Sequence, residues 1–158
     1  MNIKESKIMN IVDLCKIKYP NQVESGNIQF GQDSQDSPIV IKYWAVPNIA
    51  QPTEAELEAE IPQYQRQFDV QTFKSDIDRK VGVLLDSTAQ SRGYSSVNSI
   101  ISYAISTNVQ WKAEADAFVA WRDQVWEHVY IEYMAIDVGG EIPDENVFMA
   151  SLPKIVWP

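Results

Sequence analysis

The sequence contains very little cysteine, histidine and glycine. One cysteine, Cys15, one histidine, His128, and six glycines occur among 158 residues. A single cysteine excludes an internal disulfide framework and any metal site built from several thiolates, and a lone histidine has no second imidazole to share a metal ion. Glycine-rich phosphate-binding loops, metalloprotease motifs and EF-hand loops are also missing. The residues therefore identify no catalytic, cofactor-binding or metal-binding site.

Long apolar runs are absent, and positive charge is scarce. No segment approaches about 18 consecutive apolar residues, so we expect that the chain does not span a membrane. Residues 1–20 show no signal-peptide pattern, so we expect that the chain is made in a cytoplasm. The formal net charge is −9, and residues 51–158, with 8 basic and 17 acidic side chains, account for all of it. Because an acidic surface repels phosphate groups, we expect neither nucleic-acid binding nor docking on an anionic membrane. An acidic surface more often serves solubility or binds a basic partner.

The first third of the chain changes from helical to strand periodicity. In residues 5–20, apolar side chains recur at three- and four-residue steps, which predicts an amphipathic helix. Pro20 should stop this helix. Alternation at Ile28 and Phe30 and the β-branched and aromatic run 38–44 predict two strands, joined by the polar turn residues 31–37. We expect a β-hairpin with Ile39, Ile41 and Tyr43 on one face and Val40, Lys42 and Trp44 on the other.

Residues 51–66 predict a short connector helix. Thr53 and Glu56 have the spacing of a capping box, in which each side chain satisfies a backbone N–H at the start of a helix. Pro52 precedes this helix, and Pro62 should end it after about two turns. Its alternate glutamates point about 200° apart on a helix and cannot converge on one metal ion.

Residues 67–158 predict a helical bundle with an extended C-terminal tail. Helical periodicity and capping residues predict three main helices, from residue 68 to Gly93, from Ser95 or Ser96 to about Thr107, and from Asn108 to about Ala135, the last being the longest. Pro143 and Asp144 then open a short fourth helix. The apolar tail, residues 152–158, should fold back on the helices or be held by a partner.

The predicted fold class is α+β and mainly helical. A small N-terminal helix and β-hairpin module occupies residues 1–50, the capped connector helix residues 51–66, and a three- to four-helix bundle with its tail residues 67–158.

The stretch 117–130 gathers two tryptophans, an arginine and the only histidine. At about 100° per residue, one face of its helix carries Ala115, Phe118, Arg122, Val125, Val129 and Tyr133. An arginine within an apolar stripe predicts pairing with a carboxylate, for example Glu114 or Asp123, or stacking on Trp126; the alternative is an anion-binding clamp. His128 lies about 100° from this face and on the far side of the helix from Asp123, so we expect neither a catalytic triad nor an acid–base pair.

Five tryptophans exceed what a core of this size usually requires. Trp, Tyr and Arg are also the residues that anchor protein interfaces. The candidate interface residues are Tyr43, Trp44, Trp121, Arg122, Trp126 and Trp157. They predict contacts with other proteins and with further copies of the chain.

Two parts of the chain resemble phage tail proteins. Residues 18–60, with KYPN at 18–21, a hairpin that ends in Trp44 and QPTEAELEA at 51–59, resemble short phage tail proteins of the XkdW type. Residues 79–158 are similar to helical segments of phage tail-fibre, baseplate-associated and fibre-assembly proteins. This second similarity is carried by RGY at 92–94, SYA at 102–104, Glu114 with Ala115, WRDQVW at 121–126, Leu152-Pro153 and Trp157-Pro158. The polar loop 33–37 departs from the XkdW type, which usually has a glycine-rich turn there.

The resemblance implies a non-enzymatic structural component of a phage tail, baseplate or tail-fibre attachment region. Such a protein would be made in the host cytoplasm and located in the virion, with other tail, baseplate or fibre proteins and copies of itself as partners. One alternative is a tail-fibre assembly chaperone that is absent from the mature virion. A small hydrolase with two converging carboxylates is another, although no spacing in the sequence points to it.

Overall fold

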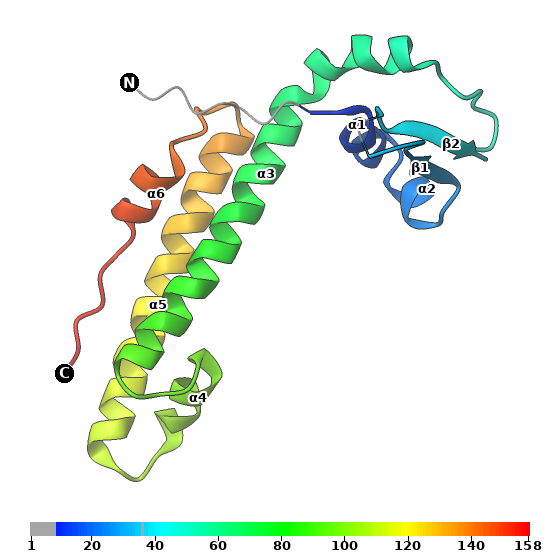
Figure 1. Cartoon of the computed structure of the whole chain (residues 1–158). Helices are drawn as coiled ribbons and strands as arrows, with labels where there is room; N and C mark the ends of the chain where they lie inside the picture. Colours follow the sequence, from blue (N-terminus) through cyan, green and yellow to red (C-terminus); the bar gives the residue numbers. More distant parts are fainter. Residues whose placement is uncertain (1–8, 36) are drawn as a thin grey trace. The chain divides into compact units, whose positions relative to one another are not determined.

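A computed structural model describes residues 9–35 and 37–158, which form mainly helices and one small hairpin (Figure 1). The predicted fold class, α+β and mainly helical, is confirmed. The chain divides into two compact units, Met1–Gln71 and Thr72–Pro158, here called unit 1 and unit 2. Within the part that the structure describes, no helix is long and apolar enough to cross a membrane.

Unit 1 begins with two short helices, α1 (Ile11–Lys18) and α2 (Pro20–Glu24). Asn10 starts α1 through a capping box, because its side chain accepts from the N–H groups of Val12 and Asp13 while the Asp13 carboxylate accepts from its backbone N–H. Pro20 is the first residue of α2. A proline is tolerated there because the backbone N–H that it lacks would have no partner within the helix. The earlier start predicted at residue 5 lies outside the described residues.

The hairpin pairs β1 (Ile28–Gly31) with β2 (Val40–Trp44) in antiparallel fashion. Ile28 lies opposite Trp44 and Phe30 opposite Ile41, so a β-bulge leaves Lys42 as the extra residue of β2. Ile41 and Trp44 therefore share one face, and the predicted strict alternation along this strand is wrong.

The core of unit 1 forms where α1 meets the first part of the long helix α3 (Glu54–Ser91). It contains Met9, Ile11, Leu14, Cys15, Leu57 and Phe68. Burial raises the pKa of the Cys15 thiol to about 11, so this cysteine is a neutral core residue. Trp44 belongs to the same unit, with its ring edge-to-face against Tyr19 at 5.3 Å and its Nε1 donating to the Ile49 carbonyl at 2.8 Å.

Helix α3 (Glu54–Ser91) is 38 residues long and continues through Pro62. The capping box is present: the backbone N–H of Thr53 donates to the Glu56 carboxylate at 2.7 Å. The prediction that Pro62 ends this helix is wrong, because apolar residues before and after it, such as Leu57 and Phe68, pack into one core and keep the chain helical. Residues 51–66 are thus no separate connector, and the boundary between the units falls inside α3.

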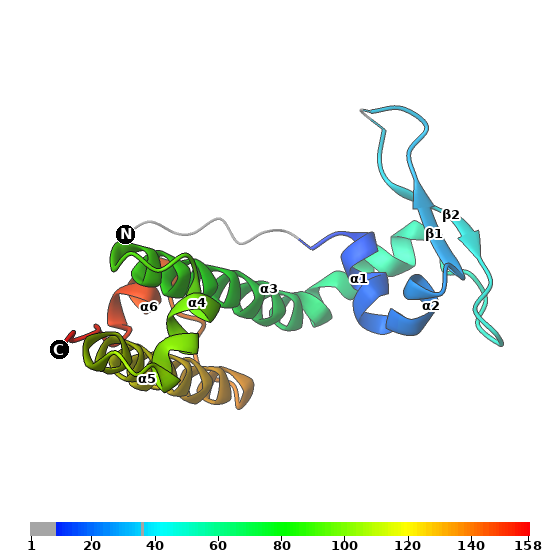
Figure 2. The same cartoon turned by 90° about the horizontal axis from the view of Figure 1, so that it is seen from below.

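Unit 2 is built on the second part of α3 and on α5 (Val109–Asp137), which lie side by side in both views (Figures 1 and 2). The buried side chains at their contact are Phe73, Ile77, Val81, Leu85 and Ala89 of α3 and Ala115, Phe118, Val125, Val129, Tyr133 and Ile136 of α5. They recur every three or four residues, as expected for packed helices. Tyr133 adds a polar link, since its hydroxyl donates to the Lys74 carbonyl and to Asp78 Oδ1, both at 2.9 Å. With 29 residues α5 is shorter than α3, so the prediction that it is the longest helix is wrong.

Three shorter elements complete unit 2: α4 (Val97–Ser102), the 3-10 helix η1 (Tyr103–Ile105) and α6 (Glu145–Ser151). The predicted caps are in place, with Ser96 before α4, Asn108 before α5 and Asp144 before α6. Ile105, the last residue of η1, is 92% exposed.

The C-terminal tail, residues 152–158, folds back on the helices as predicted. Leu152 is buried, and Trp121 Nε1 donates to the Pro153 carbonyl at 2.8 Å. The Trp157 ring stacks on Phe118 with the ring centres 6.4 Å apart. The tail therefore covers part of the α5 core face.

Candidate functional site

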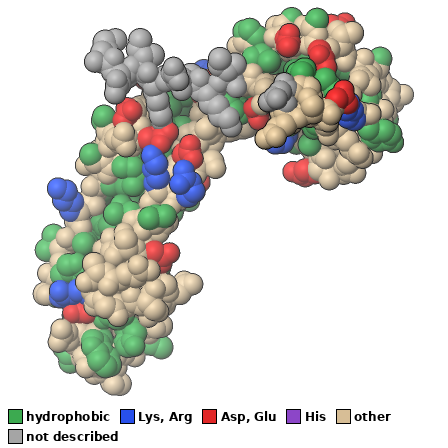
Figure 3. Space-filling view, viewed as in Figure 1, with side chains coloured by type: hydrophobic (Ala, Val, Ile, Leu, Met, Phe, Trp, Pro, Cys, Tyr) green, Lys and Arg blue, Asp and Glu red, His purple; other side chains and the backbone are tan. Residues whose placement is uncertain are grey.

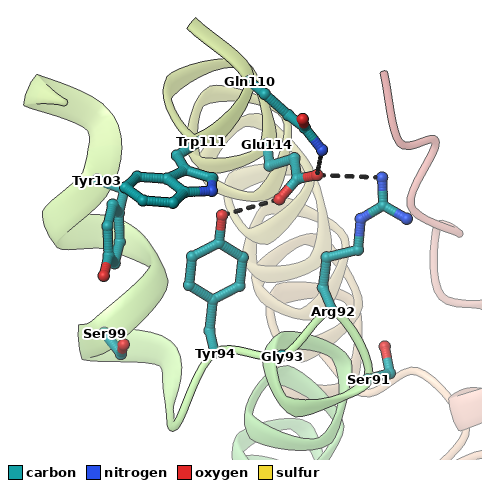
Figure 4. Close-up of a pocket in the computed structure, with 9 residues that line it drawn as sticks. All are labelled: Ser91, Arg92, Gly93, Tyr94, Ser99, Tyr103, Gln110, Trp111 and Glu114. Atoms are coloured by element: carbon teal, nitrogen blue, oxygen red, sulfur yellow. Dashed lines mark hydrogen bonds and ion pairs between the residues drawn. The ribbon is translucent and has the colours of Figure 1, made fainter. Parts of the chain in front are cut away.

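Glu114 is the only charged side chain that is buried among the described residues. It is 5% exposed and lies on the second turn of α5. Three donors reach its carboxylate: the Tyr94 hydroxyl at 2.8 Å, Gln110 Nε2 at 3.2 Å and Arg92 Nη2 at 3.2 Å (Figure 4). A buried charge of this kind is costly unless it is paired, and here the pairing is complete.

The turn after α3 brings two of these donors to Glu114. Gly93 has a φ of +91°, a conformation that residues with a side chain rarely adopt, and its N–H donates to the Gln90 carbonyl. The chain reverses there, so Arg92 and Tyr94 both approach α5 (Figure 4). Gln110 is one turn before Glu114 on α5 itself and reaches it along the helix.

The proton of this cluster belongs to the tyrosine. The hydrogen bond from Tyr94, supported by Gln110 and Arg92 and opposed by burial, holds the pKa of the Glu114 carboxyl below its usual value. Burial and the neighbouring Glu114 carboxylate raise the pKa of Tyr94 to about 12. At neutral pH the pair is therefore a carboxylate and a phenol. General acid–base catalysis favours a pKa near neutrality, and both pKa values are shifted away from it.

The cluster forms one wall of an open hollow of about 540 Å³. The hollow is lined by Ser91, Arg92, Gly93, Tyr94, Ser99, Tyr103, Gln110, Trp111 and Glu114. Three of these rings meet edge to face, with Tyr94 and Tyr103 at 5.3 Å and Tyr103 and Trp111 at 5.5 Å. Trp111 keeps 48% of its surface exposed beside the hollow. Glu114 is the only carboxylate among the lining residues.

Arg92 connects the hollow to the C-terminal tail. Its guanidinium lies 5.2 Å from the centre of the Trp157 ring while it pairs with Glu114. Trp157 in turn stacks on Phe118 in the α5 core face. One arginine therefore helps to fix both the buried carboxylate and the tail.

The six residues predicted as an interface are divided between the two units. Tyr43 and Trp44 belong to unit 1, where Tyr43 is 50% exposed and Trp44 packs on Tyr19. In unit 2, Trp121 is buried, and Trp126 lies against Tyr130 with the ring centres 6.0 Å apart. Trp157 is the member of the set that contacts the Glu114 cluster, through Arg92.

Arg122 and His128 have structural partners. Arg122 donates through Nε and Nη2 to Asp123 Oδ1 at 3.0 and 2.7 Å, so the predicted pairing with a carboxylate is confirmed and Asp123 is the partner. His128 lies at the edge of α5, where Nε2 is 3.0 Å from Ser151 Oγ. In residues 9–35 and 37–158, no three His, Cys, Asp or Glu side chains are placed to hold a metal ion.

Sequence reasoning did not identify the cluster of Arg92, Tyr94 and Glu114. From helical geometry, Glu114 was predicted only as a possible partner of Arg122 on the same helix. One signal was available: Arg92, Tyr94 and Glu114 all lie among the residues for which a resemblance to phage tail-fibre and fibre-assembly proteins is predicted, and that resemblance stays a prediction. The sequence predicted that the helix ends at Gly93, but it did not show that the turn there brings Arg92 and Tyr94 to Glu114.

Comparisons with known proteins identify no relative. No family model matches the chain, and neither a curated protein nor a solved structure does. The functional argument therefore depends on the residues and their geometry.

Proposed function

We propose that the chain is a non-enzymatic structural component of a phage tail, baseplate or tail-fibre attachment region that acts through protein–protein contacts. The observation that carries this proposal is the group of apolar side chains exposed at the end of unit 2 where α5 begins. Ile105 is 92%, Val109 84% and Trp111 48% exposed. In Figure 3, hydrophobic side chains gather at this end of the molecule. The phage resemblance includes residues of the same end, at 92–94, 102–104 and 114.

This end of unit 2 has the features of a docking site. Exposed apolar side chains beside a concave surface are typical of protein interfaces, and a half-exposed tryptophan is a common anchor. The three donors that bind Glu114 keep Tyr94 and Arg92 in fixed positions at the wall of the hollow. A preformed wall of this kind lowers the entropy lost when a partner binds.

The geometry of the hollow favours a contact over a reaction. A glycosidase needs two carboxyl groups that face each other across a substrate, about 5–9.5 Å apart. The lining residues include one carboxylate, and its oxygens accept from Tyr94, Gln110 and Arg92.

Quantitative mass spectrometry of purified phage particles tests the location. We expect the chain in the particles at a constant ratio to the other tail proteins, and its absence from washed particles would contradict the proposal. The docking site is tested with Val109→Glu, which should reduce incorporation because a charge replaces exposed apolar surface. Val156→Glu is a matched control, since Val156 is also 84% exposed but lies on the tail. Equal incorporation of both variants would exclude this end of unit 2 as the contact.

A tail-fibre assembly chaperone is the second candidate. The acidic composition of residues 51–158 favours it, because an acidic surface around an apolar patch suits temporary shielding of a basic, aggregation-prone partner. In that case the same experiment gives a different result: the chain is missing from mature particles, and deletion of its gene leaves fibres that are present but misfolded.

A further inference from the structure

A second apolar surface lies on the outward side of the last turns of α5 and its C-cap residue, Val138. Tyr130 and Ile131 are each 60% exposed, Met134 is 69% and Val138 is 87% exposed. At about 100° per residue, these four positions fall within about 60° of one line along the helix. That line is opposite the buried core face of the same helix. We call these four residues the outer seam.

The spacing of the outer seam is that of a helix–helix contact. Ile131, Met134 and Val138 follow one another at steps of three and four residues, as apolar residues do where one helix packs along another. Tyr130 widens the seam on one side, and the Trp126 ring lies against it. Aromatic and methionine side chains are frequent anchors in grooves that accept amphipathic helices.

The sequence that carries the outer seam has acidic side chains and no lysine or arginine. Residues 123–138 contain four carboxylates, Asp123, Glu127, Glu132 and Asp137, and no lysine or arginine. Arg122 pairs with Asp123 and Lys74 with Asp137. Among the ion pairs of the described residues, none includes Glu127 or Glu132. Glu127 lies on the line of the seam, one turn before Ile131.

We propose that the outer seam binds an amphipathic helix of a partner protein that carries lysine or arginine beside its apolar stripe. A basic helix can place its stripe on the seam and its cations beside Glu127, which lies on the line of the seam, is exposed and lacks an ion pair among the described residues. A second copy of this chain fits less well, because its own α5 would bring the same carboxylates against those of the first copy. The proposal concerns a surface other than the hollow, and it can be tested on the isolated chain whether or not the chain is a virion protein.

A model peptide provides the probe. It is a 21-residue helix with leucines at positions i, i+3, i+4 and i+7 and lysines on both flanks, and its binding to the full chain is measured by fluorescence anisotropy. A scrambled peptide has the same composition and charge but no continuous apolar stripe. We expect the striped peptide to bind at least about tenfold more tightly. Equal binding of both peptides would show general attraction to an acidic protein and would overturn the proposal.

Substitutions in the chain locate the contact. Met134→Glu should weaken binding of the striped peptide about tenfold, although simple charge attraction predicts stronger binding when a carboxylate is added. Val83→Glu is the matched control, because Val83 is similarly exposed, at 64%, and lies on α3. It should leave the affinity within about twofold. Ile131→Ser, which removes apolar surface without adding charge, should also weaken binding and serves if Met134→Glu disturbs folding.

Sedimentation of the chain alone tests whether a second copy of the chain, rather than a partner helix, covers the outer seam. We expect a monomer at concentrations where the peptide binds. If the chain is a dimer that Met134→Glu separates while Val83→Glu does not, the seam belongs to a second copy and the proposal is wrong. The proposal is also wrong if Met134→Glu and Val83→Glu change the peptide affinity equally.

Discussion

At the scale of single residues, Glu114 shows how a buried charge is kept in a small protein. The carboxylate loses its water shell, and three donors from α5 and from the turn after α3 replace it. Removing one partner from such a group is costly because the remaining polar atoms stay buried without their bonds. The cluster is therefore expected to contribute to the stability of unit 2 as well as to the shape of the hollow.

Glu114→Gln is expected to destabilise unit 2 by about 2 kcal/mol at pH 7, because the ion pair with Arg92 is lost and the carboxylate that accepts from Tyr94 becomes an amide. The pKa of Glu114 is lowered on folding from 4.5, so its charge contributes stability above about pH 4.5, and this contribution is lost as the pH falls through the lowered folded pKa. Urea unfolding at pH 7 and pH 3 measures the difference between wild type and variant, which should shrink in acid. Glu127→Gln, at an exposed position of α5, is the control. A difference that does not depend on pH would contradict this assignment.

Helical geometry was sufficient for residues whose partners lie on the same helix. It placed Phe118, Val125 and Val129 in the core and predicted a carboxylate partner for Arg122, which proved to be its neighbour Asp123. It failed for Glu114, whose partners Arg92 and Tyr94 come from another part of the chain. Contacts of that kind depend on tertiary structure, which a single sequence does not encode in any short pattern.

At the scale of elements, four capped helix starts were predicted correctly, whereas the helix end at Pro62 and the helix start at residue 68 were wrong. Thr53, Ser96, Asn108 and Asp144 cap helices as expected, because a cap depends on side chains within three residues of it. Whether a proline ends a helix depends on the packing around it. The loss of one backbone hydrogen bond at Pro62 is outweighed by the burial of apolar residues on both sides. The bulge at Lys42 is a similar case, since it is defined by the register between two strands.

Pro62→Ala is expected to stabilise unit 1. Pro62 is exposed and lies inside α3, so alanine restores the backbone hydrogen bond to the carbonyl of Glu58 without removing a buried side chain. We expect an increase of about 1–3 kcal/mol in the free energy of unfolding, reduced by the greater freedom of the unfolded chain. Thermal melting followed by Trp44 fluorescence measures it in a background where the other four tryptophans are phenylalanine. Gln63→Ala, the next exposed position of α3, should change stability by less than about 0.5 kcal/mol. No gain from Pro62→Ala would show that the helix is already broken at this position in solution.

At the scale of the whole molecule, the described residues form a core in each of the two units. The core of unit 1 gathers around Leu14 and Leu57, and that of unit 2 around Phe118 and Val125. Two docking surfaces are proposed above: the surface beside the hollow, where α5 begins, and the outer seam. Both belong to unit 2. The division therefore separates the hairpin from the surfaces that we expect to bind partners, and the two units should also differ in how they unfold.

Leu14→Ala tests this independence. Leu14 is fully buried in unit 1, and truncation of such a leucine costs about 2–5 kcal/mol because a cavity remains. In hydrogen-exchange mass spectrometry, we expect faster exchange in α1, β1 and β2 and unchanged exchange in α5, because local unfolding follows cooperative units. Val129→Ala, at a fully buried position of unit 2, should give the opposite pattern. If Leu14→Ala accelerates exchange in α5 as much as in α1, the chain unfolds as one cooperative body, and a substitution in either unit would then alter the surfaces that we assign to unit 2.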